Sequence, residues 1–174
     1  DQDDWLTAGG VAAVTGLVYL IDEPFKDFWQ DDIRNNGTDE AASIFQAFGD
    51  TKWILPALPT FFAVGGVVRY GFDNVEEGGR IQETALLAAE AFIISAGITE
   101  GIKNLAGRER PNNADDHDIF EGLGGSKSFP SGHSTHAWAL AAVVASEYQH
   151  SPAIQIGAYT LAALTSLSRI NDNK

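Results

Sequence analysis

The chain has 174 residues, 44% of them apolar and 20% charged, which is enough for one domain, residues 1–174, with its own hydrophobic core. Its net charge of −13 would repel a polyphosphate, so we expect no nucleic-acid partner. The absence of cysteine excludes disulfides, thiolate metal sites and cysteine catalysis. A chain that starts at Asp1 without methionine favours an exported protein of the bacterial periplasm or membrane surface, although a trimmed polypeptide or a fragment would start in the same way.

Several apolar stretches raise the question of a membrane span. The best of them, residues 5–21, is at the lower edge of the length that crosses a bilayer. No loop carries an excess of lysine and arginine that would orient a membrane topology, and the mean hydropathy of −0.09 is low for a polytopic membrane protein. The buried helices of a soluble bundle are also apolar on all sides, so we favour a soluble or membrane-associated bundle over an integral membrane protein.

The apolar positions recur at helical spacing along nearly the whole chain, and no alternating run predicts a strand. The fold class is therefore all-α, a multi-helix bundle. The predicted helices cover about residues 4–21, 24–34, 40–48, 53–70, 75–106, 133–149 and 152–169. Turns are expected at 35–39, 49–51 and 71–74. Gly107 ends the longest helix, and Pro111 prevents its continuation.

Residues 108–132 form a predicted loop of a length that is typical of binding loops and lids. Its acidic residues around His117 could suggest calcium. However, no register of the loop places a glycine at the sixth position that a calcium loop requires. We therefore predict no metal site there and an exposed His117.

Lys103 lies near the end of the longest predicted helix, opposite its acidic side. That side carries Glu76, Glu83 and Glu90. At 100° per residue these project about 140° or more from Lys103, whereas Arg110 falls within about 20° of it if the helical turn persists. We therefore expect two cations that point into the bundle, where buried charges need anionic partners. The alternative is an ion pair between Lys103 and Glu100, which would leave Arg110 unexplained.

The sequence Pro130-Ser131-Gly132-His133 opens the next predicted helix. Such an entry leaves backbone N–H groups unpaired at the positive end of the helix, which suits phosphate or a similar oxyanion. His133 would stand beside this anion, which raises its pKa, and would donate a proton to a leaving oxygen. An N-capping serine followed by a histidine without function explains the stretch equally well. His136 is expected to support the site or to be structural.

Arg169, near the end of the last predicted helix, is a third candidate cation. Alone, it is most simply a partner of the helix dipole. Together with Lys103 and Arg110, it would add a third positive group beside the backbone donors and the histidine of the preceding motif. Such a pocket suits a transferring phosphoryl group, because its equatorial oxygens carry the charge that must be stabilised.

The order and spacing of these residues resemble the type 2 phosphatidic acid phosphatase family, which shares its fold with bacterial acid phosphatases and vanadium haloperoxidases. Lys103 and Arg110-Pro111 match a Lys-x6-Arg-Pro motif, residues 130–133 match Pro-Ser-Gly-His, and Ser168-Arg169 opens the third motif. The four-residue motif alone would occur by chance in roughly one random chain of this length in a thousand. The resemblance covers Lys103 to the C-terminus, and the first hundred residues contribute only compatible helices.

The resemblance implies an all-helical bundle that hydrolyses a phosphomonoester or diphosphate through a phosphohistidine, without a metal or cofactor. His133 would protonate the leaving group. The phosphate oxygens would be held by Lys103, Arg110, Ser131, Gly132 and Arg169. Apolar helices in an exported phosphatase favour a lipid phosphate at a membrane surface, although a soluble phosphomonoester fits the same pocket.

The third motif of the family continues Ser-Arg-x5-His-x3-Asp, in which the histidine is the nucleophile. Five residues follow Arg169 here, so the nucleophile would come directly after Lys174. We therefore expect that the C-terminal part of the domain is missing and that the 174-residue chain binds phosphate without turnover. A vanadate-dependent haloperoxidase, a non-catalytic phosphate- or lipid-headgroup-binding module and a purely structural helical protein are the alternatives.

Overall fold

The computed structural model of the chain describes residues 24–108, 121–123, 125 and 127–172, together with residues 5, 9, 10 and 13. The described residues form helices and connections and contain no strand, which confirms the all-α class. The elements are η1 (Trp29–Ile33), α2 (Asn36–Phe45), η2 (Gln46–Gly49), α3 (Thr51–Gly71), α4 (Val75–Ala106), α5 (Gly132–Glu147) and α6 (Pro152–Asn171). Most of the helix predicted over residues 4–21, and much of the predicted 108–132 loop, lie outside the described residues.

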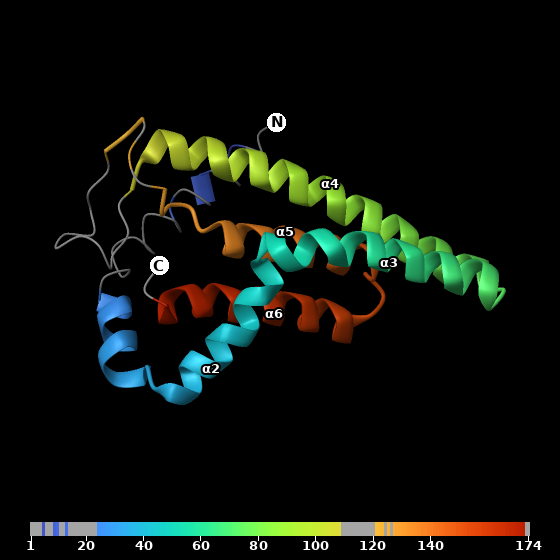
Figure 1. The fold of residues 1–174 in the computed structure, drawn as a ribbon, viewed down its shortest axis with the longest axis horizontal. Helices are drawn as coiled ribbons and strands as arrows, with labels where there is room; N and C mark the ends of the chain where they lie inside the picture. The colour runs from blue at the N-terminus through green and yellow to red at the C-terminus, as the bar shows by residue number, and fades with distance from the viewer. Residues whose placement is uncertain are drawn as a thin grey trace.

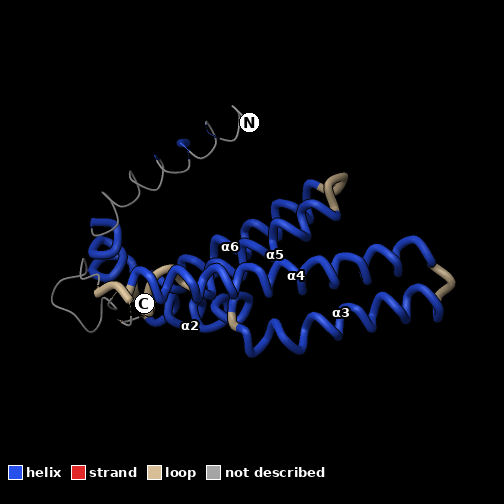
Figure 2. Tube along the Cα trace, turned by 90° about the horizontal axis from the view of Figure 1, so that it is seen from above, coloured by secondary structure: helices blue, strands red, loops and turns tan. Residues whose placement is uncertain are grey.

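The long helices form two antiparallel hairpins, α3 with α4 and α5 with α6, which are joined by the packing of α4 on α5 (Figure 1). Small side chains allow α5 and α6 to approach closely, since Ala137, Ala141 and Ala162 form a buried cluster between them. The hairpins diverge towards their connecting turns (Figure 2). At the opposite end of the bundle, the end of α4, the start of α5 and the end of α6 come together.

The boundaries of α4 agree with the prediction. The side chain of Asn74 caps its start by accepting a hydrogen bond from the N–H of Glu77. Gly107 ends it in the left-handed region at φ 58°. A Cβ atom at Gly107 would lie 2.1 Å from the carbonyl oxygen of Gly122, so both the backbone conformation and the close contact require glycine there.

The predicted turn at 35–39 is wrong, because α2 begins at Asn36. Asn35 is the N-cap of this helix, and its side chain accepts hydrogen bonds from the N–H groups of Gly37 and Thr38. The hydroxyl of Thr38 in turn accepts from the N–H of Asn35, which completes a capping box. The residues that favour a turn also cap a helix, and here the helix forms. The break predicted at 49–51 consists of one residue, Asp50, whose side chain caps the start of α3.

Residues that precede α3 hold the end of α6 through side-chain hydrogen bonds. Asn171, which is fully buried, accepts from Trp29 Nε1 at 3.2 Å and donates to Asp39 Oδ1 at 2.7 Å. One turn and a half earlier on α6, Thr165 Oγ1 donates to the carbonyl oxygen of Phe45 at 3.0 Å. The position of the end of α6 is therefore set by η1 and α2 as well as by α5.

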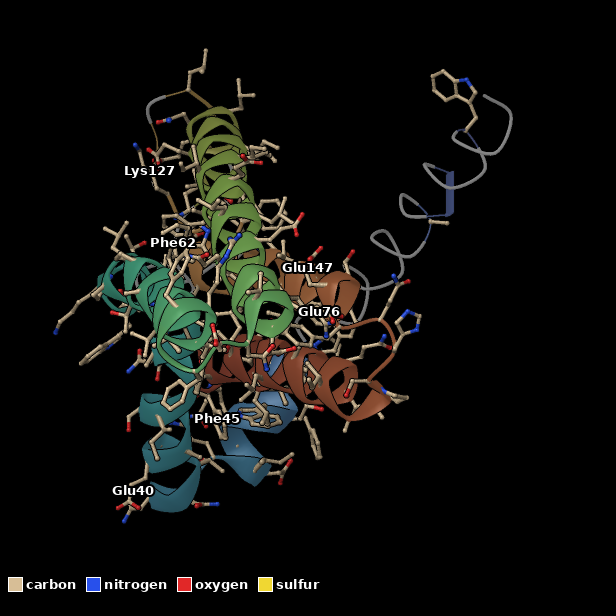
Figure 3. The ribbon with its side chains drawn as sticks, turned by 90° about the vertical axis from the view of Figure 1, so that its right-hand side faces the viewer. Glu40, Phe45, Phe62, Glu76, Lys127 and Glu147 are labelled. Carbon is tan, nitrogen blue, oxygen red and sulfur yellow. The ribbon has the colours of Figure 1, made fainter. Side chains whose placement is uncertain are left out.

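Among the described helices, α3 and α4 are long and apolar enough to cross a membrane, yet only 11% and 22% of their most apolar windows are buried. Many of their side chains stand on the outer side of the bundle (Figure 3). The exposed apolar residues include Trp53, Leu55, Phe61, Val67, Ile93, Ile94 and Ile98. We explained the apolar composition of such helices by burial on all sides. This explanation is therefore wrong for α3 and α4. Their length and composition are weak evidence for membrane association.

Candidate functional site

A cavity of about 160 Å³, the anion pocket, lies where α4 ends, α5 begins and α6 ends. Its lining consists of Lys103, Lys127, Ser128, Ser131, Gly132, His133 and Arg169. The fold thus gathers in one place all of the predicted site residues except Arg110, which lies outside the described residues. These residues come from three helices and from the segment that precedes α5.

Ser131 and Gly132 form the start of α5. Ser131 is the N-cap, and its Oγ accepts a long hydrogen bond of 3.4 Å from the N–H of Ser134. Its carbonyl oxygen accepts from the N–H and the hydroxyl of Thr135. The N–H groups of a first helical turn have no partner within the helix, and the positive end of the helix dipole adds to their attraction for an anion. The predicted capping role of Ser131 and an oxyanion-binding role are therefore compatible.

Lys103 projects from α4 towards the start of α5. Its Nζ lies 3.6 Å from the position that a Cβ atom on Gly132 would occupy. The alternative partner of Lys103, Glu100, instead pairs with Lys127, which lies beside the end of α4 (Figure 3), and accepts a hydrogen bond from Asn104. Within the described ranges, no ion pair holds the Lys103 ammonium group, so the charge remains directed at the anion pocket.

Arg169 is 7% exposed and is fixed by polar partners on two sides. Its Nη1 donates to Gln46 Oε1 and to Asp172 Oδ2, both at 3.1 Å. Its hydrogen bonds to the described residues use Nη1 alone, which leaves Nε and Nη2 able to donate to an anion. A buried guanidinium group presents its remaining donors in a fixed geometry, which suits the oxygens of a phosphate.

His133 is half-buried beside both cations. Its burial, followed by the charges of Arg169, His136 and Lys103, holds its pKa below the ordinary value of 6.5, although Asp50 acts in the opposite direction. The protein alone therefore does not impose the raised pKa that was expected beside an anion. A bound phosphate would supply the negative charge that reverses this effect, so protonation of His133 would follow the arrival of the anion.

His136 is buried one turn after His133, and its environment fixes its orientation. Its ring packs on that of Phe92, with centroids 4.8 Å apart, and its Nδ1 lies 3.2 Å from Ser95 Oγ. Because the Ser95 hydroxyl already donates its single proton to the carbonyl of Phe92, we infer that Nδ1 carries a proton and that Nε2 carries a lone pair. Burial and the charge of Lys103 lower the pKa of His136 and favour this neutral form.

Gly49 and Asp50 belong to the site although the sequence showed them only as a break between helices. A Cβ atom at Gly49 would lie 2.2 Å from the carbonyl oxygen of His133, so only glycine allows this backbone contact. The contact places Asp50 next to His133, where its charge raises the pKa of the imidazole. No local pattern could reveal this, because the two segments are distant in the sequence.

The lowered pKa values of His133 and His136 predict a loss of stability in mild acid. At pH values between the pKa of these histidines in the folded chain and their unfolded pKa near 6.5, the unfolded chain binds more protons than the folded chain. The stability that depends on keeping the two histidines neutral is therefore complete above pH 6.5 and is lost as the pH falls. We expect the urea concentration at the midpoint of unfolding to decrease when the pH is lowered from 7.5 to 5.5. The decrease should be smaller in His133→Gln. The exposed His150→Gln variant is the matched control. Equal midpoints at the two pH values would contradict the prediction.

A family model described as the PAP2 superfamily matches residues 84–174, which are more than half of the chain. The matched segment runs from within α4 to the last residue, and it contains every predicted site residue. Gln46, Gly49 and Asp50 lie before it. Neither the curated proteins nor the solved structures contain a match to the chain.

Proposed function

The chain belongs to the PAP2 superfamily, whose members are in general phosphoric ester hydrolases, and we propose that it forms the phosphate-binding part of a metal-free phosphatase. The observation that carries this proposal is the anion pocket, in which a lysine that has no ion pair with the described residues, a buried arginine and the start of a helix surround one histidine. In a chain with a net charge of −13, such a concentration of positive groups needs a specific anionic ligand.

Each side chain of the pocket has a role that its position supports. Lys103 and Arg169 would hold the phosphate oxygens together with the N–H groups of Ser131 and Gly132, and Arg110 would join them as the motif implies. These donors stabilise the negative charge of the transferring phosphoryl group. His133 would give its proton to the leaving oxygen as the ester bond breaks.

The covalent step requires a nucleophilic histidine. In the family motif, five residues separate this histidine from the arginine that corresponds to Arg169. In that step a nitrogen–phosphorus bond forms while the phosphorus–oxygen bond to the leaving group breaks, and water then releases phosphate. No histidine follows Arg169 within the 174 residues. The 174-residue polypeptide itself should therefore bind phosphate without hydrolysing the ester.

An apolar cavity of about 460 Å³ supports a lipid phosphate as the substrate. It lies between η2, α3, α4 and α5, and Ala47, Phe48, Trp53 and Ile54 are among its lining residues. Gly49, Asp50 and Thr51, which stand between these residues in the sequence, line a polar cavity that shares His133 with the anion pocket. The apolar cavity would suit an alkyl chain, and the exposed apolar side chains of α3 and α4 suit a membrane surface.

The test uses the purified 174-residue polypeptide and the His133→Ala variant. We expect calorimetry to show binding of inorganic phosphate, with competition by orthovanadate. In the presence of a chelator, we expect both proteins to release no phosphate from a short-chain phosphatidic acid. Release by the wild-type chain above that by His133→Ala would contradict the predicted inactivity. Failure to bind either anion would overturn the proposed function, and peroxide-dependent bromide oxidation with vanadate would identify a haloperoxidase.

A further inference from the structure

Lys127 is a cation of the anion pocket to which the motifs give no role. Its side chain lines the pocket together with the two cations described above. The next residue, Ser128, donates from its N–H and from its hydroxyl to the carbonyl oxygen of Arg108, shortly after the end of α4. These bonds tie the segment before α5 to the end of α4, and they place Lys127 at the edge of the pocket.

The partner of Lys127 is Glu100 on α4, which lines the adjoining polar cavity. Lys127 Nζ donates to Oε1 of Glu100, and Asn104 Nδ2 donates to the same oxygen at 3.3 Å. The hydrogen bond from Lys127, followed by its charge, holds the pKa of Glu100 below its ordinary value, and the charge of Lys103 acts in the same direction. Glu100 is therefore an anion that two cations of the pocket attract, as they would attract phosphate.

The ion pair between Lys127 and Glu100 is exposed, with 51% and 55% of the two side chains accessible to solvent. Such pairs contribute little to stability, because water weakens the attraction and both side chains lose conformational freedom. A phosphate dianion carries more negative charge than a carboxylate and offers more acceptor oxygens. Lys127 can therefore exchange Glu100 for a phosphate in the anion pocket at small cost, by rotation of its flexible side chain.

We propose that Lys127 is a further phosphate ligand, which Glu100 holds beside the anion pocket and releases when phosphate binds. The proposal rests on the proposed function, because phosphate must occupy the anion pocket for the exchange to occur. It assigns opposite roles to the two members of one ion pair, since Lys127 would strengthen phosphate binding and Glu100 would weaken it by competing for the lysine.

The test is a double-mutant cycle on the 174-residue chain, with calorimetry of inorganic phosphate as the measurement. We expect Lys127→Gln to weaken binding about threefold and Glu100→Gln to tighten it about threefold, because each removes one side of the competition. In the Glu100→Gln background no carboxylate competes for the lysine. There we expect Lys127→Gln to weaken binding about tenfold, since the full contribution of a charged donor is lost.

The matched control is the pair of variants Glu76→Gln and Arg80→Gln, which break an exposed ion pair near the start of the same helix. These variants should change phosphate affinity less than about twofold, because distant surface charges are screened. An equal effect of Lys127→Gln in both backgrounds would show that the two residues act only through their separate charges, and would overturn the exchange. Weaker binding in both single variants would make the ion pair a structural support of the pocket, which also overturns it.

A second measurement uses the wild-type protein and does not depend on the folding of any double variant. A carbodiimide joins the carboxylate and the amine of an ion pair, and mass spectrometry locates the bond in peptides. We expect the cross-link between Lys127 and Glu100 to decrease severalfold once calorimetry shows saturation with phosphate. Lys103→Gln, which should bind phosphate more weakly, should keep the cross-link at the same phosphate concentration. An unchanged cross-link in saturated wild-type protein would overturn the exchange, whereas wild-type protein that binds no phosphate would be a failure of the proposed function.

Discussion

Replacing Lys103 by glutamine is expected to weaken the binding of inorganic phosphate by about 10- to 100-fold, because a charged donor to an anion contributes more than a neutral one. Lys103 is the best site for this test, since its ammonium group supports no ion pair among the described residues and its removal should leave the fold intact. Arg169 is less suitable, because its bonds to Gln46 and Asp172 also hold the end of α6.

The matched control for Lys103→Gln is Arg80→Gln. It removes one positive charge from the same helix, but Arg80 lies near the start of α4 and pairs with Glu76 and Glu77. Calorimetry at several salt concentrations would separate the two effects, since a distant surface charge acts weakly and is screened by salt. Equal losses in the two variants would show that phosphate responds to the net charge of the chain and not to the pocket.

Replacing Gly49 by alanine is expected to lower the free energy of unfolding by about 2–3 kcal/mol. The new Cβ atom would lie 2.2 Å from the carbonyl oxygen and 2.8 Å from the Cα atom of His133, and backbone cannot move aside as a flexible side chain can. The start of α5 must therefore shift, and we expect phosphate affinity to fall in the same variant.

The control for Gly49→Ala is Gly97→Ala in α4. A Cβ atom at Gly97 meets no heavy atom within 4 Å. We therefore expect the free energy of unfolding, measured in urea, to rise by about 0.5–1 kcal/mol because alanine has the better helix propensity. If Gly49→Ala unfolded at the same urea concentration as the wild-type protein, the close contact between η2 and α5 would not exist in solution.

The sequence predicts the parts of this molecule that depend on neighbouring residues. The start and end of α4 follow from local signals at Asn74 and Gly107, and the site residues stand at helix ends that the same signals locate. The expectation that they converge on one pocket comes from the need of buried cations for an anionic partner and from the family resemblance, and not from the helix signals. The placement of Arg110 stays a prediction, since it lies outside the described residues.

The sequence does not predict the features that depend on contacts between distant segments. Nothing near Gly49 indicates that it packs on His133, and nothing near Thr99 indicates that its hydroxyl lacks a hydrogen-bond partner among the residues that the structure describes. The pKa of His133 is a similar case, because its direction depends on burial and then on the charges of Arg169 and Lys103, which come from two other helices. The exposure of α3 was also missed, since an apolar composition does not distinguish burial in a protein core from exposure at a surface.

The hydrogen bonds that η1 and α2 make to the end of α6 have a consequence for how such a protein can diverge. All the motif residues stand in the matched second half of the chain, whereas the side chains that hold Asn171, and Gln46 among those that hold Arg169, belong to the unmatched first half. The chemistry and its alignment are thus encoded in separate stretches of the sequence. Substitutions around Trp29, Asp39 or Gln46 can therefore retune the anion pocket while every motif stays unchanged, and the motifs alone will not reveal that two relatives differ in what they bind.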